Sequence, residues 1–107
     1  MSDQFHVFAN PGRRTREYPF VVAVQCNAFK ASHRRLVVPL VRATEFGRVE
    51  NARFNPTFNI QGIAVVLQPL GLVNVPRADL GEPLTSLTDE ADRIIAALDE
   101  VFSVGYR

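Results

Sequence analysis

Two apolar runs decide the fold of this chain: Tyr18-Pro19-Phe20-Val21-Val22-Ala23-Val24-Gln25 and Leu36-Val37-Val38-Pro39-Leu40. A polar segment that ends in His33-Arg34-Arg35 separates them. Runs rich in β-branched residues and joined by a polar turn are typical of two paired antiparallel strands. The first run is apolar on both of its alternating faces, which places it in the interior of a sheet. The second contains Pro39, which has no N–H to donate, so we expect that strand to end at an edge or a bulge.

The segments on either side of this pair continue the β pattern. Phe5-His6-Val7-Phe8 predicts an opening strand, and Asn10-Pro11-Gly12 predicts a turn that leads into an exposed basic loop. Thr57-Phe58-Asn59-Ile60 and Ile63-Ala64-Val65-Val66-Leu67 flank the dipeptide Gln61-Gly62, which is the pattern of a β-hairpin with glycine in its turn. Most of the chain is therefore predicted to be antiparallel sheet.

Residues 88–102 carry the clearest helical pattern. Their apolar residues fall on one stripe with a period of 3.6 residues, and the charged residues occupy the opposite face. The stripe consists of Ala91, Ile94, Ile95, Leu98, Val101 and Phe102. We predict a mainly β (α+β) fold, in which a small antiparallel β-barrel or sheet precedes a C-terminal α-helix.

Length and composition predict one folded domain over residues 1–107. The chain has 107 residues, of which 47% are hydrophobic and 21% charged, values typical of a globular protein. It contains no apolar stretch long enough to cross a bilayer, and its first residues lack the basic and apolar regions of a signal peptide. Cys26, the single cysteine, cannot form an internal disulfide. We expect a cytoplasmic protein that does not associate with a membrane.

The charge of the chain is balanced overall but unevenly distributed. The formal net charge of +1 does not by itself indicate nucleic-acid binding. Residues 1–60 hold nine Lys and Arg against four acidic residues, whereas residues 61–107 hold three Arg against seven acidic residues. A solvated surface with alternating patches accounts for this asymmetry, and so does a basic half that receives an acidic partner segment.

No motif in the sequence indicates an enzyme. His6 and His33 are not accompanied by a patterned serine or cysteine, and Cys26 has no second cysteine or histidine at the spacing of a zinc site. The turn glycines are isolated and do not form a phosphate-binding loop. We therefore predict no catalytic residue, no metal site and no cofactor.

Val24-Gln25, followed by Arg34-Arg35-Leu36-Val37-Val38-Pro39-Leu40, resembles the matching stretch of the CcdB family. These are small bacterial toxins of toxin–antitoxin pairs that poison DNA gyrase. Phe5–Phe8, Asn55-Pro56 and Leu80-Gly81-Glu82 keep the order and spacing of the family, so the resemblance extends over nearly the whole chain. It implies an SH3-like antiparallel barrel with a C-terminal helix, assembled as a homodimer in the bacterial cytoplasm.

The resemblance also implies a mechanism without catalysis. In the family, the residues after the last helix enter the opening between the gyrase A subunits and trap the complex in which DNA is cleaved. This assigns gyrase binding to a tail at residues 103–107, with Ser103, Val104, Gly105 and Tyr106 as its contacts. The best-known form of the family has a Trp in this tail. Here Ser103 or Val104 takes the place of that Trp, and Tyr106 offers the aromatic contact instead.

Two further surfaces are expected from the resemblance together with the residue pattern. Val101 and Phe102 end the apolar stripe of the helix, and we assign them to the dimer interface; a frayed tail is the alternative. An acidic CcdA-like antitoxin is expected to bind an exposed basic surface through charge-assisted hydrogen bonds, and a plain solvated loop is the alternative. The antitoxin-binding residues assigned here are Phe8, Arg13, Arg14 and Arg16.

Three functions remain open at this point. The first is a gyrase poison that its antitoxin neutralises and that contacts operator DNA only within the toxin–antitoxin complex. The second is an endoribonuclease toxin of the MazF/Kid kind on a similar barrel, with Arg13 to Arg16 lining a groove at the dimer. The third is a CcdB relative that binds its antitoxin but no longer poisons gyrase, which the missing Trp motivates.

Overall fold

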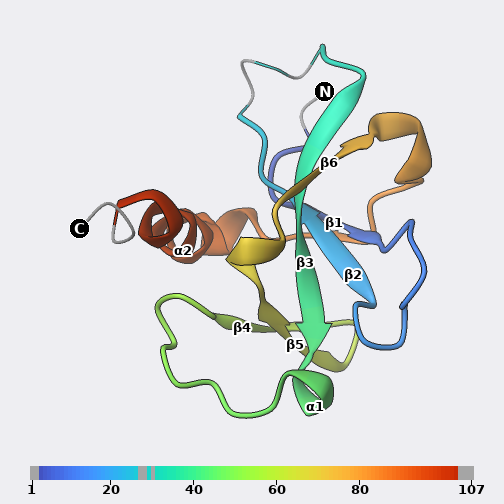
Figure 1. Ribbon diagram of the computed structural model, residues 1–107. Coiled ribbons are helices and arrows are strands. Elements are labelled where there is room, and N and C mark those ends of the chain that lie inside the picture. The colour runs from blue at the N-terminus through green and yellow to red at the C-terminus, as the bar shows by residue number, and fades with distance from the viewer. Residues whose placement is uncertain (1–2, 27–28, 30, 104–107) are drawn as a thin grey trace.

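The computed structural model describes residues 3–26, 29 and 31–103. Its central element is β3 (Arg34–Arg42), a nine-residue strand that runs through the middle of Figure 1. β2 (Phe20–Ala23) pairs with β3 in antiparallel orientation and places Val22 opposite Val38. Each of the four β2 residues is buried. The strand pair predicted from the two apolar runs is confirmed, as is the interior position of the first run.

In the described part of the chain, seven strands form one antiparallel sheet that curls into a small, nearly closed barrel. β3 pairs on its other side first with β6 and then, at its end, with β5. The remaining strands are β1 (His6–Ala9), β4 (Thr57–Ile60), β5 (Ile63–Leu67), β6 (Val73–Pro76) and β7 (Thr85–Ser86). Neighbouring strands follow the order β4-β5-β3-β2-β1-β7, with β6 beside β3. The predicted mainly β architecture with a C-terminal helix is confirmed.

The turn between β4 and β5 has the backbone that its sequence predicts. Gln61 and Gly62 both have positive φ angles, of 52° and 84°. A two-residue turn of this kind matches the twist of the flanking strands, and glycine adopts the second position without strain. The Gly62 N–H also donates to the Asn59 side-chain oxygen at 3.0 Å. The predicted hairpin is therefore present with its expected ends.

Pro39 lies inside β3 and not at its end, at a position that neither β6 nor β5 pairs with. The strand continues to Arg42. The Leu36 carbonyl accepts a hydrogen bond from the Val24 N–H, on the β2 side, at 3.0 Å. In an antiparallel strand the backbone N–H and C=O groups of successive residues point to opposite sides, so the backbone groups of Pro39 point away from β2. On that side of β3, the pairing with β6 ends at Val37 and the pairing with β5 begins at Leu40. Pro39 occupies the gap between the two pairings. The missing N–H therefore leaves no ladder hydrogen bond unmade.

Four short helical turns and one long helix complete the described part of the chain. α1 (Ala43–Phe46) follows β3 and ends at Gly47, which has a φ of 85°. The helix predicted over 88–102 forms as a 3₁₀ turn, η4 (Thr88–Glu90), followed by α2 (Ala91–Ser103). Only Ile94 and Ala97 of α2 are fully buried. The apolar stripe of the sequence is thus wider than the face that packs on the sheet.

The sheet has an apolar cluster on each face. One face packs against α2, and its cluster includes Val22, Val38, Leu40 and Ile94. The alternate residues of the same strands point to the other face. That second cluster consists of Phe8, Val21, Ala23, Val37 and Leu80, and no residue of α2 belongs to it. The second cluster is the smaller of the two, and α2 does not pack against this face.

Candidate functional site

The end of α2 presents an exposed apolar strip. Phe102 is 67% exposed, and Ile95, which lies seven residues earlier on the same side of the helix, is 45% exposed. Val101 is half-buried and Ser103 is exposed. The structure therefore places Phe102 and Ser103 of the expected contact residues at the surface. The remaining expected gyrase contacts, Val104, Gly105 and Tyr106, lie outside the described residues.

The loop between β1 and β2 holds three arginines at the surface, as predicted. Arg13, Arg14 and Arg16 are all exposed. Arg14 forms an ion pair with Glu17, and its guanidinium lies 5.2 Å from the centroid of the Tyr18 ring. Within the described residues, the side chains of Arg13 and Arg16 make no hydrogen bond. Two positive charges of this loop are therefore available to a partner.

Hydrogen bonds from one asparagine fix the shape of this loop. The Asn10 amide nitrogen donates to the Tyr18 carbonyl at 2.8 Å, which ties the two ends of the loop together. The Asn10 side-chain oxygen accepts from the Gly12 N–H at 2.8 Å. At the far end, the Arg42 Nε donates to the Arg16 carbonyl at 2.8 Å and anchors the loop to β3. The arginines therefore project from a loop whose backbone is held at both ends.

Phe8 is buried, so the expectation that it forms part of an exposed antitoxin surface is wrong. Its exposed fraction is 0%, and it belongs to the cluster on the second face of the sheet. The Arg77 guanidinium covers its ring at 5.0 Å from the centroid. β1 is buried on both faces in its middle, at Val7 and Phe8, which a four-residue pattern does not reveal. Phe8 supports the surface beside it but does not contact solvent.

A shallow apolar groove crosses the second face of the sheet, between the arginine loop and β6. It consists of two adjoining pockets of about 310 and 280 Å³, which share Asn10, Val21 and Val73. Val73 is 50% exposed, and Leu70, in the 3₁₀ turn η2 (Pro69–Gly71), is 71% exposed. The rest of the lining is mostly apolar but includes one amide and one carboxylate side chain: Pro11, Gly12, Tyr18, Val37, Pro39, Gln68, Gly71, Val75 and Asp79.

Sequence reasoning missed this groove because its walls come from distant segments. The arginine loop supplies one wall, β2 and β3 supply the floor, and the segment from Gln68 to Val75 supplies the other wall. Only the pairing of β6 with β3, which sets Val73 opposite Val37, brings these segments together. The one signal in the sequence was the apolar character of both faces of the run at 20–25.

A partly buried charge cluster ties the N-terminal segment to the sheet. The Asp3 Oδ2 accepts hydrogen bonds from the Arg35 Nε and the Arg77 Nε, each at 2.8 Å. Arg77 begins the 3₁₀ turn η3 (Arg77–Asp79), and Arg35 is only 6% exposed. Burial alone would raise the pKa of Asp3. The two hydrogen bonds and the two positive charges outweigh burial and hold the pKa of Asp3 below its ordinary value.

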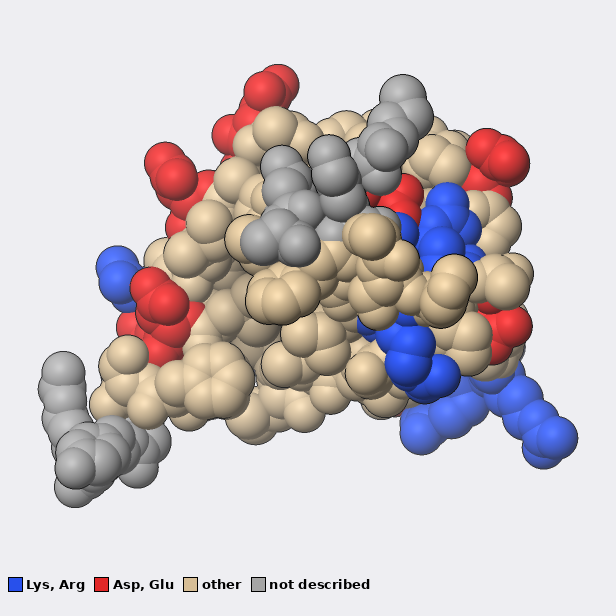
Figure 2. Space-filling model, turned by 90° about the horizontal axis from the view of Figure 1, so that it is seen from above, with Lys and Arg blue, Asp and Glu red and all other residues tan. Residues whose placement is uncertain are grey.

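Figure 2 shows how the charged side chains are distributed over one face of the molecule. Basic side chains gather mainly on the right of the view, and acidic side chains predominate on the left, on the side of α2. No group of His, Cys, Asp and Glu in the part of the chain that the structure describes is arranged to hold a metal ion. Among the same residues, no helix is long and apolar enough to span a membrane.

Two comparisons with known proteins bear on this arrangement. None of the curated proteins compared with the chain matches it. The model of one protein family, described as CcdB protein, matches residues 4–104. The match contains the whole sheet, the arginine loop and α2. Because it covers nearly all of the 107 residues, the chain belongs to the CcdB family, whose members are toxins of toxin–antitoxin pairs.

Proposed function

We propose that this protein is a toxin that binds the A subunit of DNA gyrase and traps the complex in which DNA is cleaved. The observation that carries the proposal is the family match over residues 4–104. The exposed end of α2 supports it, because Phe102 and Ser103 lead directly into the tail assigned to gyrase binding. The toxin acts by occupying its target, so it needs neither a catalytic residue nor a cofactor.

The proposed gyrase contacts are Ser103, Val104, Gly105 and Tyr106. This chain has no Trp, so the large aromatic contact of the family's best-known tail must come from another residue. Tyr106 is the only aromatic residue after Phe102 and takes that role in the proposal. A tyrosine ring is smaller than the indole of a tryptophan and carries a hydroxyl group. The proposed contact with gyrase is therefore smaller in area, and the hydroxyl needs a hydrogen-bond partner there.

The active form in this proposal is a homodimer that pairs through the end of α2. Phe102 is 67% exposed, and Val101 is half-buried beside it. Ile95 extends the same exposed strip along the helix. Large apolar side chains gathered on one helix face are typical of an interface, since water is removed from them when a second copy binds. A dimer also brings two tails to the two-fold axis of a dimeric target.

The arginine loop and the adjoining groove together suit an acidic antitoxin segment. Arg13 and Arg16 offer charge to carboxylates, and the groove, which the ends of their loop line, offers apolar contacts at Val21 and Val73. A segment that carries acidic and apolar residues in alternation matches both features. In the proposal, the antitoxin binds here and, within the complex, brings the toxin to operator DNA. Phe8 is left out of this site because it is buried.

A cleavage assay with purified gyrase tests this function. The protein is incubated with gyrase, supercoiled DNA and ATP, and the linear DNA released by denaturant and protease is measured. The full chain should increase cleaved DNA, and a variant that lacks residues 104–107 should not, although it unfolds at the same temperature. A full chain without effect on gyrase that still binds the antitoxin peptide would identify a relative that does not poison. Cleavage of RNA incubated with the protein would instead identify a ribonuclease.

A further inference from the structure

The last turn of α2 extends beyond the core. Ile94 and Ala97 are fully buried against the sheet, whereas Leu98 and Val101 are only half-buried. Phe102 and Ser103 are exposed. In Figure 1 the helix leaves the sheet and points away from it toward the C-terminus. Packing alone therefore fixes the direction of the first half of α2 better than that of its last turn.

One ion pair reaches the last turn from a distant loop. The Arg53 Nε donates to the Glu100 Oε1 at 2.8 Å, across 47 positions of sequence. The Glu100 side chain is 20% exposed and the Arg53 side chain is 68% exposed, so the carboxylate is the more buried partner. Glu100 lies three residues before Ser103. The pair thus acts on the end of the helix.

The loop that carries Arg53 has a fixed backbone of its own. The Asn51 side-chain oxygen accepts from the Arg53 N–H at 3.1 Å and from the Phe54 N–H at 3.3 Å. The Asn51 carbonyl also accepts from the Asn55 N–H at 2.9 Å. An asparagine that binds following backbone groups in this way stabilises a turn. Arg53 therefore extends toward α2 from an ordered anchor.

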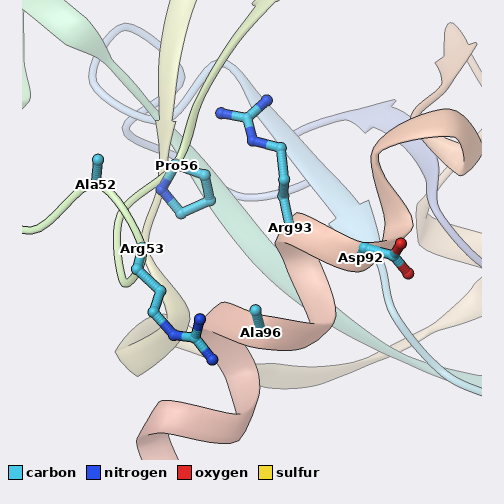
Figure 3. Close-up of a pocket in the computed structure, with 6 residues that line it drawn as sticks. All are labelled: Ala52, Arg53, Pro56, Asp92, Arg93 and Ala96. Atoms are coloured by element: carbon cyan, nitrogen blue, oxygen red, sulfur yellow. The ribbon is translucent and has the colours of Figure 1, made fainter.

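A hollow separates this loop from α2, so little packing assists the ion pair. An open pocket of about 410 Å³ lies between them and is lined by Pro56 and Ala96 together with Arg53 and Arg93. Figure 3 shows Arg53 and Arg93 at opposite ends of this pocket, with the small side chain of Ala96 between them. On the helix side the lining residues are Asp92, Arg93 and Ala96, none of which is a large apolar residue. The Arg53 side chain crosses the edge of this hollow to reach Glu100.

Arg93 lines the other end of the pocket, and it contacts the first turns of α2 and not the last one. Its guanidinium donates to the Thr57 carbonyl at 3.0 Å, lies 4.6 Å from the centroid of the Phe58 ring and pairs with Glu90. These contacts fix the first turns of α2, which Ile94 already anchors in the core. Arg93 therefore supports a part of the helix that does not depend on it alone, unlike the last turn near Glu100.

We propose that Arg53 and Glu100 are positioning residues, which fix the direction of the last turn of α2 and thereby the gyrase-binding end of the toxin. This inference rests on the proposed gyrase function. An exposed ion pair adds only about 0.2–1 kcal/mol to stability, so its loss leaves the protein folded. The same energy restricts the orientations of Phe102 and Ser103. By the relation between free energy and equilibrium constant, losing it reduces the binding-competent population by up to about fivefold.

The test uses charge reversal and its rescue. The variants are Arg53→Glu, Glu100→Arg, the double variant with both changes, and Arg48→Glu as a control. Arg48 is an exposed residue of the same loop, and its side chain makes no hydrogen bond or ion pair among the described residues. Its reversal makes the same change in net charge as Arg53→Glu. Two quantities are measured on the full chain: amide hydrogen exchange of residues 100–103, and the toxin concentration that gives half-maximal gyrase cleavage.

Each single reversal should speed exchange in the last turn and raise the half-maximal concentration by up to about fivefold. The double variant should return both quantities close to the wild-type values, and Arg48→Glu should change neither. Unaltered exchange in the single variants, or no rescue by the double variant, would overturn the positioning role. Faster exchange with unaltered gyrase cleavage would overturn it as well. A wild-type chain that never traps gyrase contradicts the proposed function instead, while hydrogen exchange still decides whether the ion pair orders the helix end.

Discussion

The backbone of Gly71 lies against the ring of Pro39, so closely that a Cβ atom on residue 71 would stand 2.5 Å from the Pro39 Cγ. The same Cβ would stand 2.9 Å from the Pro39 Cδ. Gly71 ends the turn η2, and Pro39 fills the gap in β3 between β6 and β5. Both residues line the apolar groove. This contact therefore sets how near η2 lies to β3 and how wide the groove is.

Gly71→Ala should destabilise the protein by about 1–3 kcal/mol, the usual penalty for forcing an extra carbon into a packed contact. The φ angle of Gly71 is not in the left-handed region, so steric overlap and not backbone strain is the cause. Urea denaturation measures the loss. The double variant Gly71→Ala with Pro39→Ala removes the ring and should be less destabilised than the sum of the two single changes. Strict additivity of the two would show that the ring is not what the new methyl group meets.

Asp3→Asn should destabilise the protein by about 2–4 kcal/mol, because it removes the negative charge between Arg35 and Arg77. Arg35 is only 6% exposed, so its buried charge would lose the Asp3 carboxylate that lies 2.8 Å away. Asparagine keeps the size of the side chain, which isolates the effect of charge. Asp99→Asn serves as the control, since Asp99 is exposed and makes no ion pair among the described residues. If both variants unfold at the same urea concentration, the cluster contributes nothing measurable.

The contribution of Asp3 should disappear in acid. Its folded-state pKa lies below the ordinary value of 3.8, so the carboxylate stabilises the folded state fully above that value. The contribution is lost as pH falls through the folded-state pKa, where the native carboxylate is protonated. The difference in unfolding free energy between wild type and Asp3→Asn should therefore be constant above about pH 5 and shrink below about pH 4. A difference that grows in acid would contradict the direction of the pKa shift.

Local pattern was sufficient for most of the fold. The hairpin over 57–67, the strand pair of β2 with β3 and the position of α2 follow from periodicity and turn residues, which act over a few positions of sequence. Burial was harder to predict, since it depends on which strands meet. Val7 and Phe8 are adjacent and both buried, because β1 has an apolar cluster on each side. That arrangement made Phe8 a core residue and not a contact for a partner.

The surfaces were less accessible to sequence reasoning, for a related reason. The exposure of the loop arginines could be predicted, because charged residues that follow a turn signal are typical of a solvated loop. The arginines concerned are Arg13, Arg14 and Arg16. The groove beside them and the tie between Arg53 and Glu100 each join segments more than 40 positions apart. No pattern within one segment predicts such a contact. Pro39 shows the same limit, since only the gap between β6 and β5 makes it acceptable inside a strand.

Val73→Asp should weaken binding of the antitoxin's acidic segment, and Val73→Lys should weaken it less. Both changes remove an apolar side chain that is 50% exposed in the groove, so they form a matched pair that differs in charge. The aspartate repels carboxylates of the acidic segment, whereas the lysine attracts them. We expect about a tenfold gap in Kd between the two variants, which corresponds to 1.4 kcal/mol. Titration of a synthetic acidic antitoxin peptide by calorimetry measures both. Equal affinity of the two variants and the wild type would place the antitoxin elsewhere.

Phe102→Asp should convert the proposed dimer into monomers, whereas Leu70→Asp should not. The two residues are matched, because Phe102 is 67% exposed and Leu70 is 71% exposed, yet they lie on different surfaces. An aromatic residue at the centre of an interface contributes about 2–4 kcal/mol, so its loss raises the dimer Kd by at least about thirtyfold. Sedimentation velocity over a range of concentrations follows the change in mass. If only Leu70→Asp dissociates the dimer, the interface lies on the groove side of the sheet. If the wild-type protein is a monomer at every concentration, the proposed dimer does not form. If Phe102→Asp alone yields monomers, the helix end that leads into the tail also holds the two subunits together, and dimerisation and gyrase binding then share one surface.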